Sequence, residues 1–437
     1  MTQAFSVRRR FLKGFAASAL AMGLPTLRAQ SSGRTPVVVL TAYPDEVVSR
    51  FEAAFEKAYP AYRLQVIWRM PHEALPYLQR PKQSGVDVYW SASPRTYAML
   101  AQQGLLQPLG IPLDGLPDRI GKAPLREAQA RYTATEMAGY GLAVNARALG
   151  ERGLPVPQDW KDLADPRYAK LIALPSAARV GFAPPIVEIV LQAWGWDAGW
   201  ALWSEIAGNA FLIERGSTFV TDEVSSGRHP IGVSIDFFTA SAIANGAPIQ
   251  FLYPPHNGIN PAHIAITTSA SNLAGAHAFA SFVVSPEGQA ILLHPDIRKL
   301  PVRPAVYAGQ AATQYRPFDA AEKGAFEFDS ERAQPRLALS AALFEQMLGQ
   351  PHSELVALWE RVHRAEREGK PVSEARRLLG TPPLDESSAN AATLQEGFRM
   401  RLEGQEHPVI TATEQAWAKR CTDNRARATQ LLNEAQA

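Results

Sequence analysis

Residues 36–68 read PVVVLTAYPDEVVSRFEAAFEKAYPAYRLQVIW. The apolar run at 37–40 is typical of a buried strand, and residues 45–59 place their large apolar side chains on one helical face. A second apolar run at 64–68 predicts another strand. Two strands joined through a helix pair in parallel by a right-handed crossover, so this stretch predicts the start of an α/β sheet.

The same alternation continues along the chain. A helix at 72–80, a strand at 86–90 and a helix after Pro94 complete one βαβαβα unit. A second such unit extends from about residue 171 to 247, and a strand at 262–267 is expected to return to the first sheet. The fold class predicted for most of the chain is therefore α/β.

The pattern changes from about residue 318. Helical segments dominate there, with an apolar stripe along 353–367 and a Gly-Thr-Pro-Pro break at 380–383. This region is either a packed helical cap or an appendage that binds a partner. The apolar stripes favour the cap, because they need a surface on which to be buried.

Composition excludes several classes of protein. Of the 437 residues, 46% are hydrophobic and 20% charged, which is typical of a globular chain. The formal net charge is +2, but residues 1–29 hold five basic residues and no acidic one. The remainder is slightly acidic and has no global electrostatic basis for binding nucleic acid. The single cysteine, Cys421, rules out a disulfide within the chain and a lipid-modified cysteine near the N-terminus.

The N-terminus reads as an export signal. The basic run Arg8-Arg9-Arg10 precedes an apolar stretch at 14–24 that is too short to span a bilayer. Arg8 and Arg9 resemble the pair of a twin-arginine signal, although Val7 stands where Ser or Thr is usual. Residues 1–29 are therefore predicted to be removed on export; a basic membrane anchor is the alternative. No later run approaches about 18 apolar residues, so we expect the rest to be soluble.

Five short segments occur in a particular order between residues 40 and 289. They are LTAYP at 40–44 with FEKAYP at 55–60, VDVYWSASP at 86–94, GYGLAVN at 139–145, DWKDLADPRY at 159–168 with LPS at 174–176, and FVVSPEGQ at 282–289. Together they resemble the type II periplasmic binding proteins of ABC importers. The similar branch of that class holds the ferric-ion, phosphonate and phosphoglycerate receptors.

The resemblance implies a two-lobed type II fold with a C-terminal helical extension. Lobe one is expected at 36–138 plus 256–317, lobe two at 146–247, and the extension at 318–437, with ligand held in a cleft between the lobes. The chain is expected to cross between lobes near 140–145 and 248–253.

Ligands of open parallel sheets bind at the carboxyl ends of strands, against helix N-termini. The hydroxyl-bearing candidates in such loops could equally be helix caps, and capping is the favoured role for Ser93 and for Ser217 or Thr218. Tyr140 and Tyr253, beside the expected crossings, are further candidates. The full set of uncharged candidates is Thr41, Tyr43, Ser91, Ser93, Tyr140, Ser176, Ser217, Thr218 and Tyr253.

Three charged residues bear on the ligand's charge. Arg179, close to a predicted helix start, would suit a bound anion, and Arg69 is a second candidate. The alternative for both is a solvated surface arginine. Asp236 either binds an amine or hydroxyl of the ligand or caps the following helix.

Phe237 and Phe238 stand where ferric-ion receptors of the similar branch carry adjacent tyrosines. Phenyl rings offer no ligand atoms, so we expect no metal site there, although ferric-ion binding remains an alternative function. The G-x-S-x-G, H-E-x-x-H and C-x-x-C motifs are absent, so no enzyme activity and no cofactor are predicted.

These patterns predict a periplasmic solute-binding protein of an ABC importer that captures a small polar, anionic solute. Its expected partners are that solute and an inner-membrane permease, with no nucleic acid, and a monomer is expected. The alternative is a periplasmic sensing subunit that reports ligand to a membrane sensor kinase.

Changing Arg8 and Arg9 together to Lys should block export, because twin-arginine signals depend on the guanidinium pair. Immunoblotting of periplasmic fractions would show the mature protein missing from the double variant and present in an Arg10→Lys control. Normal processing of the double variant would instead assign residues 1–29 to the general secretory route.

Overall fold

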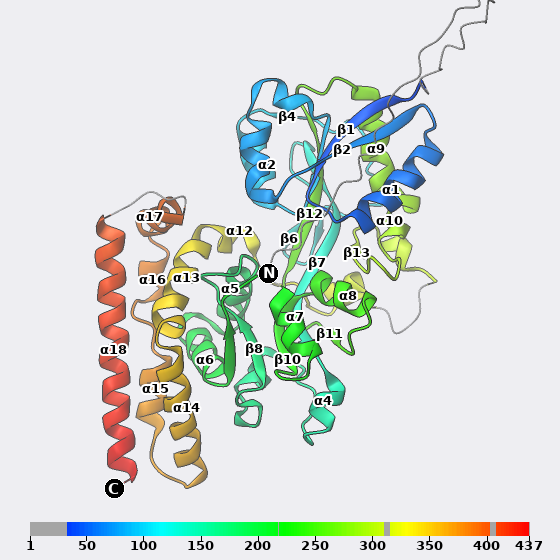
Figure 1. Cartoon of the computed structure of the whole chain (residues 1–437). Coiled ribbons are helices and arrows are strands. Elements are labelled where there is room, and N and C mark those ends of the chain that lie inside the picture. The colour runs from blue at the N-terminus through cyan, green and yellow to red at the C-terminus, as the bar shows by residue number, and fades with distance from the viewer. Residues whose placement is uncertain (1–32, 217, 310–314, 403–407, 437) are drawn as a thin grey trace, which may run out of the picture.

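The computed structural model describes residues 33–216, 218–309, 315–402 and 408–436; the expected signal segment lies outside them. Figure 1 shows two α/β lobes, one above the other, with a stack of helices on the outer side of the lower lobe. The predicted α/β class and its two lobes are therefore confirmed.

Lobe one forms around strands in the order β2-β1-β3-β12-β7. β1 (Thr35–Thr41) pairs in parallel with both β2 (Tyr62–Trp68) and β3 (Val88–Ser91), as the alternation of residues 36–90 predicts. β12 (Ile259–Thr267) returns antiparallel to β3. The main helices and smaller strands of this lobe are α1 (Asp45–Ala58), α2 (Pro71–Leu78), α3 (Pro94–Gln102), α9 (Leu273–Val284), α10 (Pro286–Ile291), β4 (Leu106–Gln107), β5 (Arg119–Ile120), β6 (Ala123–Pro124) and β13 (Leu300–Pro301).

One long strand, β7 (Tyr132–Val144), belongs to both lobes. Its residues up to Gly139 pair with β12 of lobe one. From Tyr140 onward its residues pair with β10 (Ile231–Ile235) and β11 (Gln250–Leu252) of lobe two. The backbone therefore changes lobes within a single strand (Figure 1).

Lobe two is built on β10, β8 (Ile172–Pro175) and β9 (Ala210–Ile213), which run parallel to one another. Its core contains three fully buried tryptophans, Trp160, Trp200 and Trp203. The helices of this lobe are α4 (Ala146–Gly150), α5 (Ala183–Trp194), α6 (Trp196–Gly208), α7 (Thr218–Ser225) and α8 (Asp236–Ala244).

A third crossing between the lobes follows α11 (Pro317–Glu322). Phe326 is buried in the core of lobe one and its carbonyl accepts a hydrogen bond from Lys122 N–H at 3.0 Å. Phe328, two residues later, is buried in the core of lobe two. Residues 318–326, which the sequence assigns to the extension, thus pack on lobe one, and we propose that the extension proper begins after Phe326.

The extension shares its core with lobe two. Leu339, Phe344, Trp359 and Leu432 are buried in the same cluster as the tryptophans of α6. Figure 1 shows these helices stacked beside α5 and α6, with the long α18 outermost. Among the described residues, no helix combines the length and the apolar character needed to cross a bilayer. The helices are α12 (Ser330–Ala333), α13 (Leu337–Phe344), a π-helical turn (Glu345–Gly349), α14 (His352–Arg367), α15 (Ser373–Gly380), α16 (Glu386–Ala389), α17 (Ala392–Leu402) and α18 (Pro408–Gln436).

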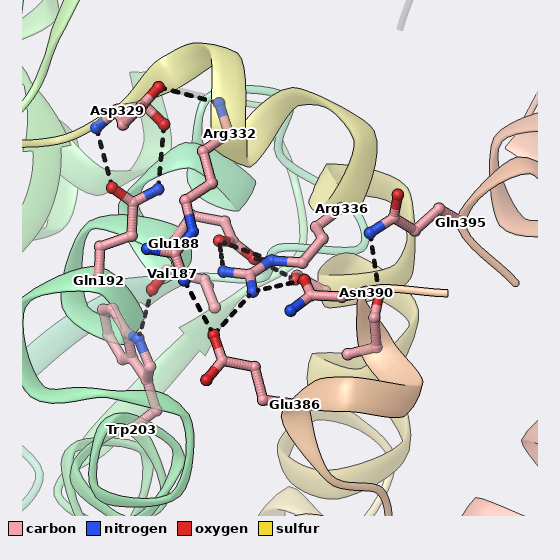
Figure 2. Close-up of polar contacts among 12 residues, drawn as sticks. Val187, Glu188, Gln192, Trp203, Asp329, Arg332, Arg336, Glu386, Asn390 and Gln395 are labelled. Atoms are coloured by element: carbon pink, nitrogen blue, oxygen red, sulfur yellow. Dashed lines mark hydrogen bonds and ion pairs between the residues drawn. The ribbon is translucent and has the colours of Figure 1, made fainter. Parts of the chain in front are cut away.

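A buried ion pair joins the extension to α5 (Figure 2). Arg336 is 1% exposed and pairs with Glu188, which also accepts a hydrogen bond from Ser340 Oγ at 2.6 Å. The same guanidinium donates to Glu386 at 3.3 Å and to Asn390 at 3.1 Å. Because both charges are fully desolvated, removal of either one leaves the other buried without compensation.

Arg336→Ala should therefore lower the free energy of unfolding by about 3–5 kcal/mol. The matched control is Arg332→Ala, because Arg332 binds the same Glu386 at 3.1 Å from a side chain that is 58% exposed. That control should cost at most about 1 kcal/mol. Urea unfolding of the two variants gives the comparison, and equal losses would show that the buried pair does not anchor the extension.

Candidate ligand-binding site

Polar residues from both lobes follow the carboxyl ends of the parallel strands. Thr41 and Ser91 end β1 and β3 in lobe one, and Ser176 and Asp236 follow β8 and β10 in lobe two. All four side chains are buried. Since ligands of open parallel sheets bind at this edge, these positions define the candidate site.

In lobe one, Thr41 and Tyr43 are tied to each other and to their surroundings. Thr41 Oγ1 accepts a hydrogen bond from Tyr43 N–H at 3.1 Å, and Thr41 O accepts one from Arg69 N–H at 2.9 Å. The Tyr43 ring packs on Trp90 with centroids 4.6 Å apart, and burial raises the pKa of its phenol well above the ordinary value. Thr41 therefore orders the loop, while Tyr43 contributes a buried ring.

Some buried hydroxyls at this edge are unsatisfied by the described protein atoms. Ser91 Oγ and Ser176 Oγ, one from each lobe, have no hydrogen-bond partner there, and neither has the Tyr43 hydroxyl. Ser93 differs, because its Oγ lies 2.8 Å from Thr96 Oγ1 at the start of α3. Buried polar atoms normally find partners, so Ser91 and Ser176 are the stronger candidates for binding solute.

Asp236 forms hydrogen bonds with both segments that cross between the lobes, β7 and the returning segment that contains Tyr253. Its Oδ2 accepts hydrogen bonds from Gly139 N–H at 2.7 Å and from the Tyr253 hydroxyl at 3.0 Å. Gly139 leaves the room that Tyr253 needs, since a Cβ there would lie 2.5 Å from its ring. The Tyr253 ring also stacks on Tyr315 at 3.7 Å. Asp236 and Tyr253 thus connect β7 with the returning segment.

Tyr140 follows Gly139 in β7, but its side chain points into the core of lobe two. Its side chain is buried in the cluster of lobe two, and burial raises its pKa above the ordinary value. Burial likewise raises the pKa of the Asp236 carboxyl, to about 7, against the opposing effect of its hydrogen bonds. The structure therefore gives Tyr140 a packing contact rather than an accessible hydroxyl.

A buried lysine that the sequence did not single out lies where the lobes meet. The Lys299 ammonium lies 5.0 Å from the ring centroids of both Tyr43 in lobe one and Phe237 in lobe two. It also pairs with Glu136 of β7, whose second oxygen, Oε2, has no partner among the described residues. No pattern distinguishes Lys299 from other lysines, because its position depends on the pairing of the adjacent β13 with β7.

Phe237 and Phe238 make aromatic packing contacts. Their centroids are 4.1 Å apart, and Phe238 packs on Phe182 at 5.7 Å. Within the described ranges, no cluster of three or more His, Cys, Asp or Glu side chains could hold a metal ion. Phe237 instead offers its face to the Lys299 cation.

The predicted arginines lie at the outer rim. Arg69 follows β2, with its guanidinium 5.0 Å from the Tyr77 ring. Arg179 follows β8, is 59% exposed and lies 3.8 Å from Glu345 of the extension, a carboxylate that sequence reasoning did not anticipate. Thr218 is exposed at the start of α7, and Ser217 lies outside the described residues.

Two further arginines occupy equivalent positions and were missed from sequence. Arg95 is the second residue of α3, the helix that follows β3, and Arg215 follows β9; both are exposed. Lobe one thus presents Arg69 and Arg95, and lobe two Arg179 and Arg215, each just beyond the carboxyl end of a parallel strand. The sequence places an arginine shortly after each of these four strands, and this repeated position could have identified Arg95 and Arg215.

Comparison with known proteins adds to this geometry. Residues 84–318 match the family of bacterial extracellular solute-binding proteins. The chain is 30% identical over 309 residues to the phosphoglycerate transport regulatory protein PgtC of Salmonella typhimurium, covering 70% of this chain and 76% of that protein.

Solved structures share the fold. One is the periplasmic binding protein AfuA of Actinobacillus pleuropneumoniae with fructose-6-phosphate bound, with a TM-score of 0.54, 20% identity, and coverage of 72% of this chain and 100% of AfuA. Iron-bound HitA of Pseudomonas aeruginosa gives 0.53 and 16%, over 66% of this chain and 92% of HitA. At these identities the likeness establishes the two-lobed type II fold alone.

Asp236→Asn should change how stability depends on pH. The folded-state pKa of about 7 exceeds the ordinary 3.8, so the unfolded chain releases this proton first as pH rises. The contribution of Asp236 is therefore complete below about pH 4 and is lost as pH passes 7. Asn keeps an acceptor oxygen but does not titrate.

Urea unfolding at pH 5 and pH 8 should show that the variant loses less stability than the native chain, by on the order of 2 kcal/mol. Asp118→Asn, at an exposed carboxylate, is the control and should follow the native chain. Identical pH dependence in all three proteins would contradict a neutral, buried Asp236.

Proposed function

Because the chain belongs to the bacterial extracellular solute-binding proteins, we propose that it is the periplasmic substrate-binding subunit of an ABC importer. It binds a small anionic solute, phosphorylated or carboxylated, between its lobes and releases it unchanged. An inner-membrane permease is the partner that receives the solute.

The arginines at the facing strand ends carry the proposal for the solute's charge. Arg69 and Arg95 in one lobe and Arg179 and Arg215 in the other place cationic groups on both sides of the candidate site. Guanidinium groups match phosphate and carboxylate oxygens in geometry as well as charge. Closure of the lobes would shield these contacts from water and strengthen them.

The buried groups of the site, Lys299 with Glu136 and the hydroxyls of Ser91 and Ser176, indicate that the rest of the solute is uncharged. Lys299 is already paired with Glu136, so its charge is compensated before any solute binds. The unsatisfied hydroxyls of Ser91 and Ser176 suit hydroxyl groups of a solute better than a second full charge. A hydroxylated phosphate or carboxylate meets both requirements.

Similar proteins are named for solutes of this class or were solved with one bound. PgtC is described as a phosphoglycerate transport regulatory protein, and AfuA was solved with fructose-6-phosphate. The word regulatory favours a second candidate function, in which the clamp reports its ligand to a membrane sensor kinase. Permease and ATPase genes beside the coding sequence would favour import, and kinase and response-regulator genes would favour sensing.

Arg179→Ala should weaken binding of 3-phosphoglycerate by roughly 10- to 150-fold, the effect of about 1.5–3 kcal/mol for one charge-assisted contact shielded by closure. Isothermal titration calorimetry measures the change. Arg147→Ala is the control, because Arg147 is 84% exposed on α4 and its partner is the neighbouring Glu151. Native affinity in the Arg179 variant would remove this residue from the site.

A further inference from the structure

Glu345 brings the extension next to the candidate site. Glu345 begins the π-helical turn between α13 and α14, and its carboxylate lies 3.8 Å from Arg179 in the loop that follows β8. Figure 1 shows α12, α13 and α17 at the end of lobe two that faces lobe one. The extension therefore meets the same rim on which the arginines lie.

The Glu345 side chain is held in place and is only 18% exposed. Gly349, at the end of the same turn, makes room for it, since a Cβ at that position would lie 2.6 Å from Oε2. That oxygen is buried and has no hydrogen-bond partner among the described residues. A carboxylate so placed keeps its charge directed at Arg179 in the ligand-free protein.

Among the charged groups that affect the pKa of Glu345, Arg179 favours the ionised carboxylate. Burial has the largest effect and raises the pKa of Glu345, Arg179 lowers it, and Glu214, which follows β9, and Glu414 of α18 raise it further. Glu414 is itself paired with Arg401 of α17. The net result is a pKa above the ordinary value, so Glu345 loses its charge earlier than an exposed glutamate as pH falls.

We propose that Glu345 of the extension is a specificity-determining residue of the ligand site: it competes with the anionic solute for Arg179 and so limits the affinity of the clamp. This inference rests on the proposed function, since it needs an anion at Arg179. When the solute binds, the Arg179 guanidinium gives up its ion pair with the Glu345 carboxylate, 3.8 Å away, and binds ligand oxygens instead. The extension thereby favours release, which an importer subunit requires at each cycle.

Glu345→Gln should therefore tighten binding. The pair is partly exposed and long, so the expected gain for 3-phosphoglycerate is about two- to five-fold in Kd. The gain should be smaller for glycerate, which carries less charge, and should shrink in an Arg179→Ala background. A residue with only a structural role would show neither dependence.

Calorimetry with 3-phosphoglycerate and glycerate on the full chain, from pH 5 to pH 8, provides the test. The ratio of native to Glu345→Gln Kd cancels the ionisation of the ligand, and it should approach one as pH falls and Glu345 is protonated. Glu374→Gln is the matched control, because Glu374 is an exposed extension residue paired with Arg377. Thermal melting confirms that each variant is folded.

The outcomes separate the two proposals. Failure of the native chain to bind either probe or inorganic phosphate would overturn the anionic-solute proposal and the inference with it. Binding that Arg179→Ala weakens but Glu345→Gln leaves unchanged at every pH would overturn the inference alone. Binding unaffected by Arg179→Ala would overturn the role of both residues while leaving a solute-binding protein.

Discussion

The structure depends on one strand that serves two sheets. β7 pairs with β12 as far as Gly139 and with β10 from Tyr140 onward, so the lobes share a continuous backbone at their junction. Asp236 fixes that junction by accepting hydrogen bonds from Gly139 in β7 and from Tyr253 in the returning segment. β7 thereby joins the two sheets, and the candidate ligand loops begin at the ends of strands in those sheets.

The charged groups of the site fall into two sets: a buried ion pair between the lobes and exposed arginines beyond the strand ends. Lys299 and Glu136 neutralise each other between the rings of Tyr43 and Phe237, at the level where the lobes meet. Four arginines lie farther out, and the extension sets Glu345 against one of them. The buried Arg336–Glu188 pair and the hydrophobic core that the extension shares with lobe two make it part of that lobe rather than an appendage.

Much of this was predictable from sequence, and the exceptions have physical reasons. The alternation of apolar runs predicted β1 to α3 because periodicity is local, and Thr41, Ser91 and Ser176 were found at strand ends for the same reason. Lys299, Glu136 and Glu345 could not be identified, since each depends on contacts between segments far apart in the chain. For Asp236 the sequence predicts either a ligand contact or a helix cap, but its hydrogen bonds to Gly139 and Tyr253 give it a hinge role that only the fold reveals.

The central claim, that the two lobes close on an anionic solute about the β7 junction, is tested most directly by an interlobe distance. Spin labels at Gln102→Cys in lobe one and Arg147→Cys in lobe two, in a Cys421→Ser background, would report it by double electron–electron resonance. Saturating 3-phosphoglycerate should shift the distance distribution to a shorter, narrower population. An unchanged distribution with the ligand demonstrably bound would contradict closure and leave a rigid receptor in its place.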